Sequence, residues 1–188
     1  MGHKASEKKD EDIAQLVQCG AVEVFGVLVD RYEEKIKNYG KKFLNRETDI
    51  EDVVQEVFLK AYRNIHGFDE KRKFSSWLYR IAHNEFINRL KKSKTEPLHF
   101  FDFDIIFPHL LNHKEEYYKE KIDRKVMDEC LDKLPLKYRE PIVLYYFHNL
   151  NYKEIADVLA VPVSTVGIRL KRGKEKLKPF CEKLKPYL

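Results

Sequence analysis

The chain has 188 residues and carries 36 Lys and Arg against 31 Asp and Glu, which gives a formal net charge of +5. Its longest apolar run, residues 142–147, is far shorter than the roughly 20 residues of a membrane span, so we expect no membrane insertion. Seven Gly and seven Pro are few for the many tight turns of a β-sandwich or barrel. Because a chain with so many charged residues cannot readily form one large hydrophobic core, we expect two small domains.

The sequence shows no pattern typical of a metal or cofactor site. Its three Cys are far apart and form no CxxC pair, so we expect them to be buried, reduced thiols. It also contains no Gly-rich phosphate loop and no HExxH or GxSxG motif. We therefore expect no metal, no cofactor and no enzymatic activity.

Helical periodicity dominates the first half of the chain. Residues 13–17 and 24–39 are predicted as two helices broken near Gly20, and apolar residues at helical spacing predict a third helix over residues 50–61. A fourth helix is expected to bury Phe74, Trp77, Leu78, Ile81, Ile87 and Leu90 and to expose Arg80, Asn84, Asn88 and Lys91. These elements predict a helical bundle over about residues 11–95, with little or no sheet.

Residues 96–120 interrupt the helical pattern. Pro97 and Pro108 disfavour a continuous helix, and aromatic residues alternate there with acidic ones. The segment carries a net charge of −4 and is predicted to be a flexible acidic linker. Two interpretations stay open: the aromatic residues pack on the domains of the chain itself, or they insert into a partner.

Helices are expected to resume at residue 122 and to end in a helix-turn-helix over residues 151–177. Asn151 and Glu154 have the spacing of a capping box, and residues 160–162 form a short turn. Ser164 is expected to cap a second helix that buries Val166, Leu170, Gly173 and Leu177. Its opposite face would present Ser164, Thr165, Ile168, Arg169, Arg172 and Lys176, which suits base edges and phosphates in a major groove.

Basic residues concentrate on either side of the acidic segment. Residues 71–94 carry a net charge of +7, and residues 169–185 carry +6. Two basic stretches separated by an acidic one indicate a protein that contacts a polyanion at two places.

Three ordered blocks resemble the extracytoplasmic-function (ECF) sigma factors of bacterial RNA polymerase. They are DIEDVVQEVFLKAYRNIHGFD (49–69), FSSWLYRIAHNEFINRLKK (74–92) and LPLKYREPIVLYYFHNLNYKEIADVLAVPVSTVGIRLKRGKEKL (134–177). The resemblance implies an all-α fold of two small helical domains. Sigma domain 2 would cover residues 11–95, the linker residues 96–120, and the helix-turn-helix of sigma domain 4 residues 121–188.

The same resemblance implies two partners, core RNA polymerase and promoter DNA, in the cytoplasm. An inhibitory anti-sigma factor is a third expected partner. Core polymerase would bind Asp52, Gln55, Glu56 and Leu59. The −10 element would contact Phe68, Lys73, Phe74, Arg80, Asn84, Asn88, Lys91 and Lys92, while Trp77 is assigned to the core. The −35 element would contact Ser164, Thr165, Ile168, Arg169, Lys171 and Arg172.

Several positions depart from the family pattern. Asn88 stands where the family usually has Asp, and Gly167 and Ile168 replace the common Lys-Ser pair. Gly173 replaces the usual Ala of R-A-R. A Gly inside a helix costs about 1 kcal/mol relative to Ala. These departures bear on the promoter sequence and on the strength of −35 binding, and they leave the predicted fold unchanged.

Two other classes of function compete with this interpretation. A free-standing helix-turn-helix regulator would use residues 151–177 but would leave the polar face around Asp52 and Gln55 unexplained. A nuclease could use Asp49, Glu51, Asp52 and Glu56 as metal ligands, yet two-metal chemistry needs carboxylates that converge in a pocket. Acids along one exposed helix do not converge by themselves.

Overall fold

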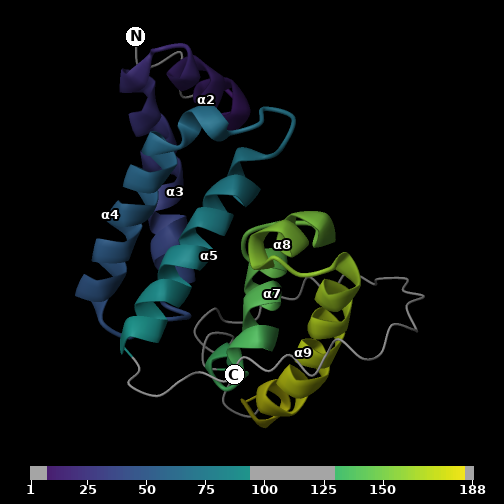
Figure 1. Ribbon diagram of the computed structural model, residues 1–188. Coiled ribbons are helices and arrows are strands. Elements are labelled where there is room, and N and C mark those ends of the chain that lie inside the picture. Colours follow the sequence, from purple (N-terminus) through teal and green to yellow (C-terminus); the bar gives the residue numbers. More distant parts are fainter. Residues whose placement is uncertain (1–7, 94–129, 185–188) are drawn as a thin grey trace. The chain divides into compact units, whose positions relative to one another are not determined.

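The computed structural model describes residues 8–93 and 130–184 and places most of them in helices (Figure 1). Within these ranges there is no strand, which confirms the all-α prediction. The chain divides into two compact units, the first with its core in α2 to α5 and the second with its core in α7 to α9, and each is described by itself. The acidic segment 96–120 and the predicted limits of the domains around it lie outside the described residues.

Over residues 8–93, the first unit contains four helices and two short 3-10 turns. In chain order these are α2 (Asp10–Gln18), η1 (Val22–Val24), α3 (Phe25–Gly40), α4 (Glu47–Arg63), η2 (Ile65–Gly67) and α5 (Phe74–Ser93). The predicted break between the first two helices is confirmed at Gly20, whose φ of +99° is a conformation that favours glycine. Cys19 beside it is exposed, so the expectation of a buried thiol is wrong for this residue.

Aromatic side chains form much of the core of the first unit. Tyr39 on α3 contacts the rings of Tyr79 and Phe86 on α5, with centroids 5.4 and 6.1 Å apart. Gly40 makes room for this contact, since a Cβ at this position would lie 2.4 Å from Cζ of Phe86. The close approach fixes the C-terminal half of α5 against α3.

The inward face of α5 differs from the predicted stripe. Phe74 and Leu78 are buried as expected, but Tyr79, Ala82 and Phe86 complete the buried face. Trp77, Ile81, Ile87 and Leu90 are only partly buried. Apolar residues occur all around this helix, so periodicity alone could not identify the face that packs against α3 and α4.

The second unit contains α7 (Leu136–Tyr146), α8 (Tyr152–Leu159) and α9 (Val163–Leu184). The predicted capping box is confirmed: Asn151 Oδ1 accepts hydrogen bonds from Lys153 N and Glu154 N, both at 3.0 Å, and Glu154 accepts one from Asn151 N. α8 ends at Ala160, which takes a left-handed conformation with a φ of +53°. This residue turns the chain into α9, as the helix-turn-helix pattern predicts.

Helix α9 begins two residues earlier than a cap at Ser164 would place it. Because Val163 is its first residue, Ser164 lies within the first turn and does not cap the helix. α9 packs along α7, where Gly173 approaches Ile142 so closely that a Cβ would lie 2.7 Å from Cδ1 of Ile142. Among the described residues, no helix has both the length and the apolar character that crossing a bilayer requires.

Candidate nucleic-acid interface and protein-docking face

The outer face of α4 combines polar and apolar side chains. Asp52 and Gln55 are exposed, Glu56 is half-buried, and Leu59 keeps 49% of its surface exposed. The opposite face buries Ile50, Val53, Val54, Val57, Phe58 and Ala61, which holds α4 against the bundle. All four residues predicted to bind polymerase therefore reach the surface of one helix.

Tyr62 extends this outer face by one turn, and the sequence analysis did not identify it. The side chain is 42% exposed, and its ring packs edge-on against Phe25 at 5.3 Å. It follows Leu59 by three residues and Gln55 by seven, so the helical spacing of the face already contained the signal. This exposed surface, made of Asp52, Gln55, Glu56, Leu59 and Tyr62, is a candidate for binding a protein and is called the docking face.

Ion pairs connect α4 to α5 at the start of this face. Arg89 on α5 donates to Asp49 at 2.7 Å and to Asp52 at 3.3 Å. Asp49 also accepts a hydrogen bond from Nε of Arg46 at 2.6 Å. The hydrogen bond from Arg89, followed by that from Arg46, holds the pKa of the Asp49 carboxyl below its usual range. Asp52 therefore belongs both to the docking face and to the link between the two helices.

A second cation connects the same two helices further along. Lys60 lies 2.7 Å from the Glu85 carboxylate on α5 and 3.7 Å from Glu56. The hydrogen bond to Glu85 raises the pKa of the Lys60 ammonium. Since Lys37 similarly pairs with Glu51 at 3.6 Å, all four acids of the nuclease hypothesis face basic side chains. Within residues 8–93 and 130–184 no group of His, Cys, Asp or Glu side chains could hold a metal ion.

The predicted polar face of α5 is exposed. Arg80, Asn84 and Asn88 follow one another at four-residue spacing, and Lys91 and Lys92 continue the row toward the end of the helix. At 1.5 Å per residue, the row from Arg80 to Lys92 is about 18 Å long. Lys73 is exposed just ahead of the helix. Two amides that can pair with base edges are thus flanked on both sides by cations that can pair with phosphates.

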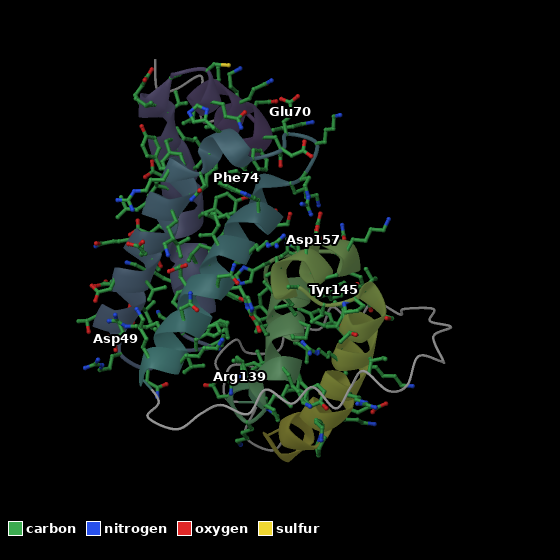
Figure 2. The ribbon with its side chains drawn as sticks, in the orientation of Figure 1. Asp49, Glu70, Phe74, Arg139, Tyr145 and Asp157 are labelled. Atoms are coloured by element: carbon green, nitrogen blue, oxygen red, sulfur yellow. The ribbon has the colours of Figure 1, made fainter. Side chains whose placement is uncertain are left out.

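Two of the residues predicted to contact the −10 element are buried. Phe68 is 5% exposed and Phe74 is fully buried, and Figure 2 shows Phe74 among the helices of the first unit. Phe74 contacts the rings of Phe68, Trp77 and Tyr32 at 5.5, 5.6 and 5.8 Å. These rings are core residues that anchor the start of α5, so they cannot reach a nucleic acid from their present positions.

Most of the predicted −35 residues on α9 reach the surface. Ser164, Lys171 and Arg172 are exposed, and Thr165 and Ile168 are partly exposed. The prediction that Arg169 lies on this face is wrong, because only 7% of its surface is exposed. Arg169 follows the buried Val166 by three residues and precedes Gly173, which lies against Ile142 of α7, by four. The helical spacing therefore turns Arg169 toward the interior.

Burial of Arg169 has a counterpart on α7. Glu140 is 6% exposed, and it is the other buried charged residue among those described in the second unit. α7 and α9 pack against each other, so the interior of this unit holds one charge of each sign. Sequence analysis missed Glu140, since an acid between Arg139 and Pro141 gives no periodic signal of burial.

Comparisons with known proteins agree with this arrangement. Residues 28–96 match the family Sigma-70 region 2, and residues 124–177 match Sigma-70, region 4. The ECF RNA polymerase sigma factor SigW of Bacillus subtilis (strain 168) is 36% identical over 173 residues, which cover 86% of this chain and 91% of that protein. The ECF RNA polymerase sigma-E factor of Haemophilus influenzae is 31% identical and covers 98% of this chain and 100% of its own length.

Solved structures show the same fold. CnrH, in complex with the cytosolic domain of CnrY, has a TM-score of 0.68 at 26% identity and covers 93% of this chain and 97% of its own. The sigma factor RpoE of Bartonella quintana, in complex with the anti-sigma factor NepR, has a TM-score of 0.65 at 21% identity and covers 84% and 96%. The chain therefore belongs to the extracytoplasmic-function sigma factors, the subunits that direct RNA polymerase to promoters for the initiation of transcription.

Proposed function

We propose that the first unit binds core polymerase through α4 and the −10 element through α5, and that the second unit reads the −35 element through α9. The observation that carries this division is the exposed row on α5. Arg80, Asn84 and Asn88 lie on the surface at four-residue spacing, while Leu78, Ala82 and Phe86 behind them are buried. A helix fixed in this way can present amides to unpaired bases and cations to the backbone without rearranging.

The docking face on α4 suits a protein partner better than DNA. It offers Asp52 and Glu56, which repel phosphates, and the exposed side chains of Leu59 and Tyr62, which provide apolar area. Exposed basic side chains instead occupy the outer face of α5 and the part of α9 that begins at Lys171. We therefore assign core polymerase to the docking face, and the proposed functions of the two helices differ because their exposed charges differ.

On α9, Ser164 and Thr165 in the first turn and Arg172 further along remain the candidates for −35 contacts. A recognition helix places its N-terminal residues against base edges, and Arg172 with Lys171 can neutralise phosphates. We leave Arg169 out of this set because its side chain is buried. Ile168 offers a partly exposed apolar side chain, which suits contact with a thymine methyl group.

The remaining assignments follow from the family. Because core polymerase forms the phosphodiester bonds, the sigma factor itself needs no catalytic group, and it works in the cytoplasm where polymerase and template lie. RpoE of Bartonella quintana was solved with the anti-sigma factor NepR, and we propose that an anti-sigma factor likewise binds this chain.

The test removes the two amides of α5. Holoenzyme with Asn84→Ala and Asn88→Ala should bind core polymerase normally but lose selection of the −10 element in run-off transcription from a random-promoter library. Each lost base contact is expected to cost about 1–3 kcal/mol of discrimination. Asn38→Ala on α3, an exposed amide away from α5, is the matched control. Unchanged −10 selection by the double variant would contradict the proposal.

A further inference from the structure

The loop of residues 65–73 connects α4 to α5 and has buried ends and an exposed tip. Ile65 and Phe68 are buried, whereas residues 69–73 are exposed and include Lys71, Arg72 and Lys73. Figure 1 shows the loop projecting beside α2. Its basic tip leads directly into the polar row of α5, so its conformation decides where those cations lie relative to that row.

Gln18 at the end of α2 holds the first stem of the loop. Its side-chain amide donates two hydrogen bonds, to the carbonyl oxygens of Ile65 at 2.7 Å and of Phe68 at 2.9 Å. An amide nitrogen has two hydrogens to donate, so this arrangement uses its full donor capacity. The 3-10 turn η2 is thereby attached to α2 from outside.

Glu11 at the beginning of α2 holds the second stem. Its Oε1 accepts a hydrogen bond from the backbone N–H of Phe74 at 2.9 Å, where α5 begins. The first N–H groups of a helix lack partners within it, and the positive end of the helix favours a carboxylate. Glu11 therefore caps α5 from another element, at the junction between loop and helix.

Helix α2, which holds the loop through Gln18 and Glu11, is itself fixed to the rest of the first unit. Asp10, next to Glu11, accepts hydrogen bonds from Arg31 and from the hydroxyl of Tyr32, both on α3. Ile13, Ala14 and Val17 bury the inner face of α2. These contacts hold α2 in place. The hydrogen bonds of Gln18 and Glu11 therefore hold the loop in a fixed position relative to the bundle.

The tip also carries hydrogen bonds of its own. The Asp69 carboxylate accepts from Lys71 N at 3.0 Å, and the Asp69 carbonyl accepts from Arg72 N at 2.9 Å. The buried hydroxyl of Ser76 donates to the Lys73 carbonyl at 2.9 Å. Held at both stems and across the tip, the loop is ordered before any nucleic acid arrives, which lowers the entropic cost of binding.

We propose that Gln18 and Glu11 are positioning residues for −10 recognition, acting on the 65–73 loop without touching DNA. The inference rests on the proposed function of α5 and adds that the loop must be held by α2 for the −10 strand to bind tightly. It assigns a role in promoter binding to a helix that carries none of the predicted DNA contacts.

The main experiment compares two identical substitutions on one helix. Gln18→Glu keeps the size of the side chain but removes both donors, whereas Gln15→Glu makes the same change in charge at an exposed position of α2. Holoenzymes of both variants would be titrated with a single-stranded oligonucleotide carrying the −10 element recovered from the promoter library. We expect Gln18→Glu to weaken binding about tenfold and Gln15→Glu to leave it unchanged, since two modest hydrogen bonds are lost in the first only.

A second pair tests the other stem. Gln at position 11 can still accept the hydrogen bond of Phe74, so Glu11→Gln should retain −10 binding, while Glu11→Ala should lose it severalfold. Hydrogen exchange should show faster exchange of the amides of residues 66–74 in both Gln18→Glu and Glu11→Ala. Retention of −10 affinity by these two variants, with exchange accelerated, would overturn the inference.

A destabilised variant separates positioning from general loss of stability. Val54→Ala removes buried volume from α4 without touching the loop and should leave the −10 affinity of assembled holoenzyme unchanged. An equal loss of −10 affinity in Val54→Ala and Gln18→Glu would overturn the inference. If Asn84→Ala abolishes −10 selection while Gln18→Glu does not, only the role of α2 fails. If neither variant affects it, the proposed function of α5 fails.

Discussion

Gly173 occupies a position where a single methyl group decides how closely two helices pack. A Cβ there would lie 2.7 Å from Cδ1 of Ile142 and 3.2 Å from the carbonyl oxygen of Tyr138. Gly167, another position of α9 that departs from the family pattern, is also buried. The contact with Ile142 gives a structural reason for Gly where related sequences commonly carry Ala.

Gly173→Ala should therefore lower the free energy of unfolding of the second unit. Replacing Gly by Ala inside a helix gains about 1 kcal/mol, but overpacking costs about 1–3 kcal/mol. Adding Ile142→Val removes Cδ1 and should recover most of the loss. Urea denaturation followed by circular dichroism measures both effects. Gly26→Ala on α3, where a methyl group meets open space, is the control and should stabilise. The explanation fails if Gly173→Ala is as stable as Gly26→Ala.

For most residues of the candidate sites, the sequence correctly predicted whether the side chain is exposed or buried. It was wrong for a few residues that matter for DNA binding. The exposed positions of Asn84, Asn88 and Arg172 followed from helical spacing. The burial of Phe74 followed from the same spacing, although the family resemblance also assigned this residue a −10 contact. Arg169 was expected on the exposed face of α9 and is buried. Arg169 belongs to the buried side of α9 despite its charge, and Phe74 stabilises the start of α5 from inside.

Among the elements, α4 and α5 are joined by charges as well as by apolar contact. Asp49 accepts from both Arg89 and Arg46, and its pKa is lowered mainly by the hydrogen bond from Arg89. A lowered pKa in the folded state means that the contribution to stability is present above the unfolded pKa of about 3.9. It is lost as the pH falls through the folded value.

Asp49→Asn should accordingly flatten the acid limb of the stability curve. The difference in urea midpoint between wild type and variant should be present at pH 7 and begin to shrink below about pH 4, where Asp49 is protonated in the unfolded chain. It should reach zero once the pH has fallen through the lowered pKa of Asp49 in the folded protein. Glu47→Gln at the start of α4 changes the same charge without this pair of hydrogen bonds and serves as the control. A difference that persists unchanged at low pH would show that Asp49 acts through something other than its charge.

The inward face of α5 shows what periodicity could not predict at this scale. The position and length of α5 agreed with the prediction. The side chains that it buries, however, include Tyr79 and Phe86 and not Ile81 and Ile87. The choice depends on Gly40 of α3, which admits the Phe86 ring. The two hydrogen bonds from Gln18 to the 65–73 loop could not be predicted either, because their carbonyl acceptors lie 47 and 50 positions away in the sequence.

At the scale of the whole molecule, we propose that different faces of the first unit bind different partners: α4 binds core polymerase and α5 binds the −10 element. Asp49 and Glu70 lie toward opposite ends of this unit (Figure 2), so the ion pairs of Asp49 are well separated from the tip of the basic loop. Substitutions on the docking face should then affect core binding without changing DNA selection.

Gln55→Ala with Leu59→Ala tests this separation. Loss of an amide and of exposed apolar area should weaken core polymerase binding by about 1–3 kcal/mol, measured by fluorescence anisotropy of labelled sigma factor. The helix content should not change, because both side chains point outward. Asn38→Ala is the control for the loss of an exposed amide. Normal core affinity in the double variant would remove the docking face from the account.

The central claim is that two units read two separate promoter elements, and one measurement tests it most directly. Run-off transcription from a random-promoter library would be performed with core polymerase and wild-type, Asn84→Ala or Arg172→Ala sigma factor. The account predicts that wild-type transcripts share two spaced upstream elements, that Asn84→Ala relaxes only the −10 element, and that Arg172→Ala weakens dependence on the −35 element only. Relaxation of both elements by either variant, or of neither by both variants, would contradict it.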